Sequence, residues 1–271
     1  MSTESSALYD VPGPRALARH RTYGWIVTVL LVGVLAWVVY KLFDTDQFAY
    51  DKWAPFEYVG VQKLLLRGLR NTLQIFAWAA ALSLAFGAVF AAGRLSDHRV
   101  VRWLSGLVVE FFRAMPVLVL IFFIFIAMKV EPRLALIFGL TLYNGSVLAE
   151  VFRGGVNAVP KGQSEAAYAL GMRKTTVMVS ILIPQAVRTM LPTIISQLVV
   201  TLKDTSLGYL ISYEEFLYAG KQIATNLDYS LPFIPVVIVI APIYIGMCML
   251  LSGLARYLES SGRRRRRTAA A

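Results

Sequence analysis

The chain has 271 residues, of which 57% are hydrophobic. One soluble core of this length could not hide so much apolar surface, so the composition excludes an ordinary soluble domain and indicates a protein that uses lipid as a second solvent. The net charge of +11 could suit a nucleic-acid-binding protein, but Lys and Arg cluster at the ends of apolar runs, and we therefore expect no nucleic-acid partner.

Six stretches are candidates for transmembrane helices, since a helix rising ~1.5 Å per residue needs about 20 apolar residues to cross a hydrocarbon core of ~30 Å. They are residues 25–43, 72–92, 104–128, 134–152, 190–212 and 231–254. Residues 59–69 form a shorter apolar stretch with basic side chains at Lys63, Arg67 and, directly after it, Arg70, which predicts a separate interfacial helix on the outer surface. The expected fold class is an all-α membrane protein with six transmembrane helices.

The distribution of Lys and Arg predicts the orientation of these helices, because basic loops stay on the cytoplasmic side. When the N-terminus is placed inside, the inner segments hold most of these residues and the outer segments hold fewer. An even number of spans then places both termini in the cytoplasm. We expect a multi-pass protein of the plasma (inner) membrane.

Small residues recur every four positions in the second span, at Ser83, Gly87 and Ala91. This spacing is typical of helices whose backbones approach each other closely. The alternative is a chance arrangement in a helix rich in alanine.

The segment between the fourth and fifth spans, residues 153–180, predicts a short helix across the inner membrane face. Pro160 breaks the preceding helix, Ser164 is the expected N-cap, and Gly171 is the expected C-terminal cap. Its alanines would form a smooth knob that fits a groove on a partner. The carboxylate of Glu165 would fix the orientation of the helix in that groove.

The spacing within this segment carries a specific resemblance. Glu165, Ala166 and Ala167 are followed after three residues by Gly171, and after nine more by Ile181, Leu182, Ile183 and Pro184. The pattern resembles the EAA signature of the permease subunits of bacterial ABC importers, with Ile183 where leucine is usual.

Flanking residues narrow the resemblance to the polar amino acid permease subfamily. They are Arg153 to Gly155, Pro160 to Gln163, Pro184 to Ala186, Arg188, Leu191, Pro192 and Lys203 to Leu207. Within that subfamily the chain looks most like the second permease of glutamate importers. The resemblance covers residues 64–259 and implies the type I importer (MetI-like) core of five helices, to which this chain adds one N-terminal helix.

The resemblance also implies a function and its partners. Glu165, Ala166, Ala167, Gly171 and Pro184 would couple the chain to a dimer of ATP-binding cassette ATPases, which would bind ATP and Mg²⁺. A second permease, expected to be a related but different chain, and an extracytoplasmic solute-binding protein would complete the importer. The expected substrate is a polar amino acid, glutamate in the first place and another polar amino acid as the alternative.

These expectations divide the chain into five regions. They are a cytoplasmic tail at 1–23, the extra transmembrane helix at 24–44, an external segment at 45–63, the permease domain at 64–259 with its coupling helix at about 161–175, and a basic cytoplasmic tail at 260–271.

Lys203 and Asp204 are charged residues inside the fifth span. They lie about 20 Å from its inner end at Met190, and a charge in the hydrocarbon core costs about 3 kcal/mol or more. Neighbours in a helix point in different directions, so each needs its own partner. Two interpretations stay open: Lys203, Asp204, Thr205 and Ser206 line the substrate path, or they pair with other helices to hold or gate the fold.

Glu110 and Arg113 share one helix face in the third span, and Pro116 follows within a turn. The span is longer than the core requires, which predicts a kink near Ala114. We favour a hinge role for Arg113 over a place in the substrate path.

No phosphate-binding Gly-x4-Gly-Lys-Ser/Thr loop occurs, so the chain is not expected to hydrolyse ATP or to hold a cofactor or metal itself. The competing function is a secondary carrier driven by an ion gradient, which broken helices and intramembrane charges would also suit. Such carriers generally contain two related halves, whereas the EAA-like segment occurs once.

Overall fold

The computed structural model describes the backbone of residues 14–269 and the side chains of residues 18–254 and 257. Within these limits every regular element is helical, as predicted. The predicted basic tail at 260–271 and the first part of the predicted N-terminal tail lie outside the described side chains. The chain divides into two units, Met1–Trp53 and Ala54–Ala271, which are described separately.

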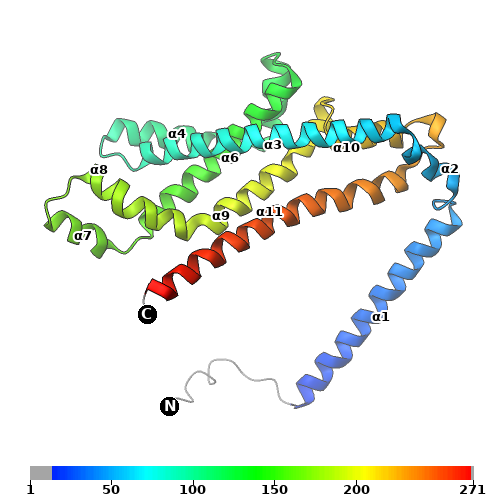
Figure 1. The fold of residues 1–271 in the computed structure, drawn as a ribbon, viewed down its shortest axis with the longest axis horizontal. Coiled ribbons are helices and arrows are strands. Elements are labelled where there is room, and N and C mark those ends of the chain that lie inside the picture. The colour runs from blue at the N-terminus through cyan, green and yellow to red at the C-terminus, as the bar shows by residue number, and fades with distance from the viewer. Residues whose placement is uncertain (1–13, 270–271) are drawn as a thin grey trace. The chain divides into compact units, whose positions relative to one another are not determined.

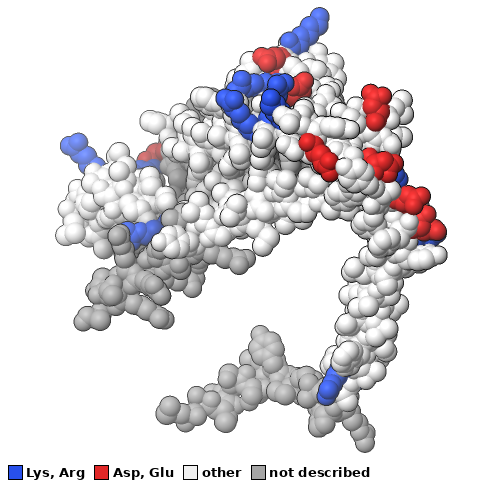
Figure 2. All heavy atoms as spheres, turned by 45° about the vertical axis from the view of Figure 1, so that its right-hand side comes forward, with Lys and Arg blue, Asp and Glu red and all other residues white. Residues whose placement is uncertain are grey.

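The first unit consists of the long helix α1 (Pro14–Asp44) and the short helix α2 (Tyr50–Trp53). Residues Ala18–Asp44 are long and apolar enough to cross a membrane, and none of this helix is buried inside the chain. The charged residues among the described side chains of α1, which are Arg19, Arg21, Lys41 and Asp44, lie near its two ends (Figure 2). The apolar surface between these ends suits contact with lipid.

The second unit holds the remaining elements, which Figure 1 shows in chain order. They are η1 (Ala54–Glu57), α3 (Val59–Arg94), α4 (Arg99–Ala114), α5 (Val117–Phe122), η2 (Phe123–Ala127), α6 (Pro132–Asn157), α7 (Lys161–Ala169), α8 (Lys174–Val177), η3 (Met178–Leu182), α9 (Ile183–Asp204), η4 (Thr205–Ile211), α10 (Phe216–Ala224), η5 (Leu227–Tyr229) and α11 (Phe233–Ala269).

The described part contains five helices that could each cross a membrane, and a sixth span if a bent pair is counted as one. The bent pair is α4 with α5 and η2, whose axes meet at 99°. The predicted kink near Ala114 is therefore confirmed. Met115 is extended (φ −81°, ψ 134°), because proline at 116 disfavours a helical conformation in the residue before it.

The predicted interfacial helix at 59–69 is wrong, because α3 runs without a break from Val59 to Arg94. Gly68, which weakens the helix signal in the sequence, has a packing role instead. A Cβ added at Gly68 would lie 2.9 Å from the Cβ of Ala219 in α10. The glycine thus lets α10 approach the backbone of α3 while α3 continues as a helix.

The most extensive helix contact in the second unit joins α3 to α6. Ser83, Gly87 and Ala91 are all buried, and a Cβ at Gly87 would lie 2.8 Å from the Cβ of Leu148 in α6. The small residues therefore allow close helix packing, as their spacing predicts. The contact is made within the chain.

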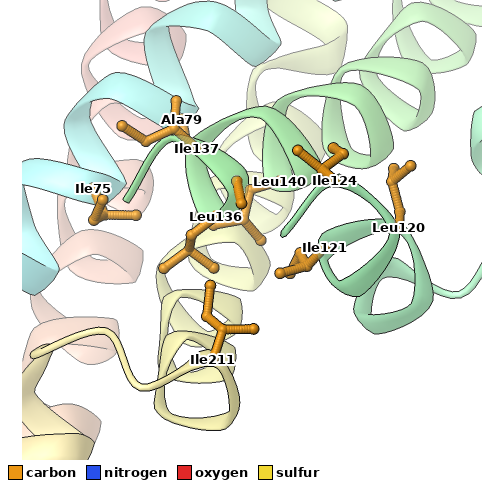
Figure 3. Packing of buried hydrophobic residues seen from close by; sticks show 10 residues of the cluster. Ile75, Ala79, Leu120, Ile121, Ile124, Leu136, Ile137, Leu140 and Ile211 are labelled. Atoms are coloured by element: carbon orange, nitrogen blue, oxygen red, sulfur yellow. The ribbon is translucent and has the colours of Figure 1, made fainter. Parts of the chain in front are cut away.

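A hydrophobic cluster beside this contact joins five elements (Figure 3). Ile75 and Ala79 come from α3 and Ile211 comes from η4, while Leu136 and Leu140 of α6 lie between them. Leu120, Ile121 and Ile124 add the bent segment α5–η2. The cluster thus fixes the segment that follows the 99° bend against α6.

Gly87→Ala is expected to lower the free energy of unfolding by about 1–3 kcal/mol, because the added methyl group overpacks the contact between α3 and α6. Gly246→Ala in α11 is the matched control, since a Cβ there meets no atom within 4 Å. Thermal unfolding of the purified chain in detergent measures the difference. Equal midpoints for the two variants would contradict the assigned contact.

Candidate functional site

The predicted short helix between the fourth and fifth spans is α7, and its start differs from the prediction. α7 begins at Lys161, with Pro160 as its N-cap residue. The hydroxyl of Ser164 donates a hydrogen bond to the carbonyl oxygen of Lys161 (2.8 Å), so the prediction that Ser164 is the N-cap is wrong. Proline occupies that position because its lost N–H is one that the first helical turn leaves unpaired anyway.

The end of α7 is confirmed at Gly171, which has φ +74°. Its amide donates to the carbonyl oxygen of Tyr168 (2.9 Å), and the amide of Met172 donates to that of Ala167 (3.2 Å). This pair of bonds is a Schellman cap, which requires a left-handed residue and favours glycine. α7 therefore stops at Ala169, and the predicted range to about 175 also includes the start of α8.

The three residues of the Glu-Ala-Ala triplet do not share one face. Ala167 is buried against its own chain, whereas Glu165 and Ala166 are exposed. Leu170, just beyond the helix, is 82% exposed. The surface that α7 offers to another molecule therefore includes Glu165, Ala166 and Leu170, and Ala167 attaches the helix to the chain.

The Ile-Leu-Ile-Pro end of the EAA-like pattern lies at a change of helix type. Met178–Leu182 form a π-helical turn, η3, and Pro184 follows in the first turn of α9. Proline lacks the N–H that an uninterrupted α-helix would require at this position. α7 contacts both α8 and η3, so this irregular turn lies directly beside it.

Charged side chains join α3, α4 and α6 at the end of the unit where α7 lies. A guanidinium nitrogen of Arg94 lies 3.0 Å from a carboxylate oxygen of Glu150 and 3.2 Å from a carboxylate oxygen of Glu110. Glu150 also pairs with Arg153 (2.8 Å), and Glu110 pairs with Arg113 (2.9 Å), as the spacing of Glu110 and Arg113 predicts. We call these five residues the charged joint.

A second ionic contact ties α8 to the loop between α3 and α4. The Lys174 ammonium group donates to the Asp97 carboxylate and to the carbonyl oxygen of Leu95 (3.2 Å). The hydrogen bond from Lys174 is the main reason why the pKa of Asp97 lies below its usual value. The contact is exposed and so contributes orientation more than stability.

A buried amide pair connects the two long helices on either side of α7. The side-chain amide of Gln197 in α9 donates to the side-chain oxygen of Asn144 in α6 (2.6 Å). Asn144 is fully buried and donates to the carbonyl oxygen of Leu140 (3.0 Å). Sequence reasoning missed this pair, although two amide side chains within apolar spans were a usable signal.

Lys203 and Asp204 lie where α9 changes from an α-helix to the 3₁₀ helix η4. The hydroxyl of Thr205 donates to the carbonyl oxygen of Leu202 (2.7 Å), and the hydroxyl of Ser206 donates to the carbonyl oxygen of Lys203 (2.8 Å). The Lys203 side chain is exposed and Asp204 is half-buried. Among the described residues, neither charge has an ion-pair partner within 4 Å.

Glu215 is a further residue that the sequence analysis did not single out. It is fully buried and caps α10, because its carboxylate accepts the amides of Leu217 (2.8 Å) and Tyr218 (2.7 Å). The hydroxyl of Tyr244 in α11 also donates to it (3.0 Å). The amino-terminal amides of α10 are thus already bound, which leaves them unavailable to an anionic solute.

The family described as the binding-protein-dependent transport system inner membrane component matches residues 83–264. The glutamate transport system permease protein GluD of Corynebacterium glutamicum is 39% identical over 237 residues, which are 83% of this chain and 86% of that protein. The probable glutamine ABC transporter permease protein GlnP of Bacillus subtilis is 34% identical over 197 residues, 71% of this chain and 90% of that one.

Solved structures agree with the predicted fold. An amino acid ABC transporter crystallised with histidines has a TM-score of 0.69 at 26% identity and covers 76% of this chain and 97% of its own. The MetNI methionine ABC transporter has a TM-score of 0.60 at 16% identity, and the match covers 74% of this chain and 98% of that one. It shares the fold. Because the family match extends over more than half of the sequence, this chain belongs to the inner membrane components of binding-protein-dependent transport systems.

Proposed function

We propose that this chain is the transmembrane permease subunit of an ABC importer and that it carries glutamate across the plasma membrane. The presentation of α7 between α6 and α9 is the observation that carries the proposal. Likeness to GluD supports glutamate, as does likeness to the glutamate/aspartate import permease GltK of Escherichia coli, 32% identical over 172 residues. Likeness to the glutamine permease makes another polar amino acid the alternative.

The partners follow from the single α7 in this chain. An ATPase dimer offers two equivalent clefts, so two permease subunits would supply the two helices, and we propose a related second permease as the other. The ATPases would bind ATP and Mg²⁺, and an external solute-binding protein would deliver the amino acid. In this arrangement α7 and both termini lie on the cytoplasmic side.

A force on α7 would reach the spans through contacts that the structure contains. Glu165, Ala166 and Gly171 would form the docking element, Ala167 would hold it to the chain, and Pro184 would end the irregular turn behind it. The buried bond between Gln197 and Asn144 joins α9 to α6, so the two helices that flank α7 would move together. The charged joint passes this motion to α3 and α4, which gives Glu110 and Arg113 a mechanical role.

The substrate path would include the change of helix type at Lys203, Asp204, Thr205 and Ser206. Both charges lack an ion-pair partner within the described residues, and unpaired charges within a membrane usually face a cavity or another molecule. A zwitterionic amino acid carries both complementary groups. The alternative is that these charges pair with the second permease.

A secondary carrier is the competing function, because broken spans such as α4–α5 also occur in carriers. The presence of one α7 and the family match both favour the importer. The two functions differ in energy source, so uptake into vesicles that depends on ATP and survives collapse of ion gradients would separate them.

Gly171→Leu is expected to abolish uptake, because leucine is strained at φ +74° and would unseat the cap of α7. Glu165→Trp should have the same effect through the docking surface itself. Both variants should still insert into the membrane. Radiolabelled uptake by the complex in proteoliposomes measures the loss, with Gly246→Leu as a control at an unobstructed glycine. Normal uptake by both variants would remove α7 from the coupling role.

Lys203→Gln and Asp204→Asn are expected to change the KM for transport or the substrate-stimulated ATPase activity by about tenfold or more, as for the loss of a charge-assisted hydrogen bond. Lys129→Gln, in the loop between η2 and α6, is the control for loss of a positive charge elsewhere. If both kinetic parameters stay at the parent values in both variants, these residues belong to the fold and not to the substrate path.

A further inference from the structure

A pocket of about 390 Å³ lies between α4 and the adjoining ends of α3 and α6. It has no part in the proposed transport path. Three guanidinium groups from three different helices line it: Arg94 from α3, Arg102 from α4 and Arg153 from α6. Such convergence of like charges requires either internal anions or a bound one.

Internal carboxylates hold two of these arginines in place. Arg94 bonds to Glu150 (3.0 Å) and Glu110 (3.2 Å), and Arg153 bonds to Glu150 through two nitrogens (2.8 and 3.0 Å). Arg102 donates instead to a neutral group, the carbonyl oxygen of Ser96 (3.0 Å). The side chains are thus oriented, while each guanidinium keeps further N–H groups for a ligand.

The charges around the pocket do not balance. Arg113 also pairs with Glu110, so three guanidinium groups share the two carboxylates of Glu110 and Glu150, and Arg102 adds a fourth positive charge without a carboxylate partner among the described residues. The cluster therefore keeps a positive excess. Arginine binds phosphate oxygens through two parallel hydrogen bonds, and this makes a phosphate group the fitting anion.

Glu110 also lines the pocket, where its carboxylate is bonded to Arg94, and the remaining walls are apolar. Trp103 is 65% exposed and Leu107 is 54% exposed. Gly106 lies between them along α4, and a Cβ there would meet no atom within 4 Å. The missing side chain leaves open space beside the arginines.

The position of the pocket places it at the level of lipid headgroups. The candidate spans formed by α3 and α6 end at Arg94 and Asn157, and the pocket lies at these ends. An exposed tryptophan beside arginines at the end of a span is typical of the membrane interface. A basic pocket between helices at this level suits the phosphate of an anionic lipid.

We propose that this pocket binds the headgroup phosphate of an anionic phospholipid, with Arg94, Arg102 and Arg153 on the phosphate oxygens and with Trp103 and Leu107 along the start of the acyl chains. Because the charged joint forms one side of the pocket, the lipid would brace α4 against α6 near α7. The site depends on the membrane location of the chain and not on the identity of the transported solute.

Lipid retention by the complete transporter complex tests the proposal. The complex is purified after exchange into phosphatidylglycerol or phosphatidylcholine, and bound lipid is measured by native mass spectrometry. Arg102→Gln is expected to lower phosphatidylglycerol retention roughly fivefold, the effect of one arginine near a charged membrane surface. Gly106→Leu should lower it as well by filling the pocket without changing any charge.

Arg99→Gln is the matched control, because Arg99 is exposed one turn earlier on α4 and does not line the pocket. The proposal is supported if Arg99→Gln retains as much phosphatidylglycerol as the parent complex while Arg102→Gln and Gly106→Leu lose it. Equal retention of phosphatidylglycerol and phosphatidylcholine by the parent complex would overturn it, as would equal losses in all three variants. Binding of inorganic phosphate alone, without retained lipid, would assign the pocket to a soluble anion and refute the lipid assignment.

Discussion

The close packing of α3 on α6 fixes the position of α7, because α6 ends at Asn157 and α7 begins at Lys161. A side chain at Gly87 or Gly145 would press these helices apart, so small residues set where the proposed coupling segment lies. The return helix α9 is then bound to α6 by the amide pair of Gln197 and Asn144. A polar helix placed between two such helices cannot move without moving both, and this is what a coupling element requires.

Two classes of polar residue inside this unit serve different purposes. The amide pair and the capped Glu215 are satisfied by other groups of the same chain, as buried polar groups in lipid usually are. Lys203 and Asp204 differ, because neither has an ion-pair partner among the described side chains. This contrast is why we assign the first class to holding helices together and the second to meeting a substrate.

Sequence periodicity and breakers predicted most of the fold, because long apolar runs, Pro116 and Gly171 act through local rules. The errors arose where a tertiary contact decided the outcome. Basic side chains suggested a separate interfacial helix at 59–69, yet α3 continues through Gly68, which makes room for α10. Ser164 looked like a cap, yet Pro160 starts the helix. Neither the bond between Gln197 and Asn144 nor the bond between Tyr244 and Glu215 could be predicted from the sequence. The partners are separated by 53 and 29 positions along the chain, and they meet only after the helices pack.

Cross-linking from α7 to the ATPase tests the central claim most directly. In a variant with Cys248 replaced by serine, a cysteine at Leu170, which is 82% exposed, should form a disulfide with a cysteine in the ATPase cleft. The yield should change with bound nucleotide. Labelling of that cysteine by a membrane-impermeant maleimide from outside intact cells, or the absence of any cross-link to the ATPase, would contradict the account.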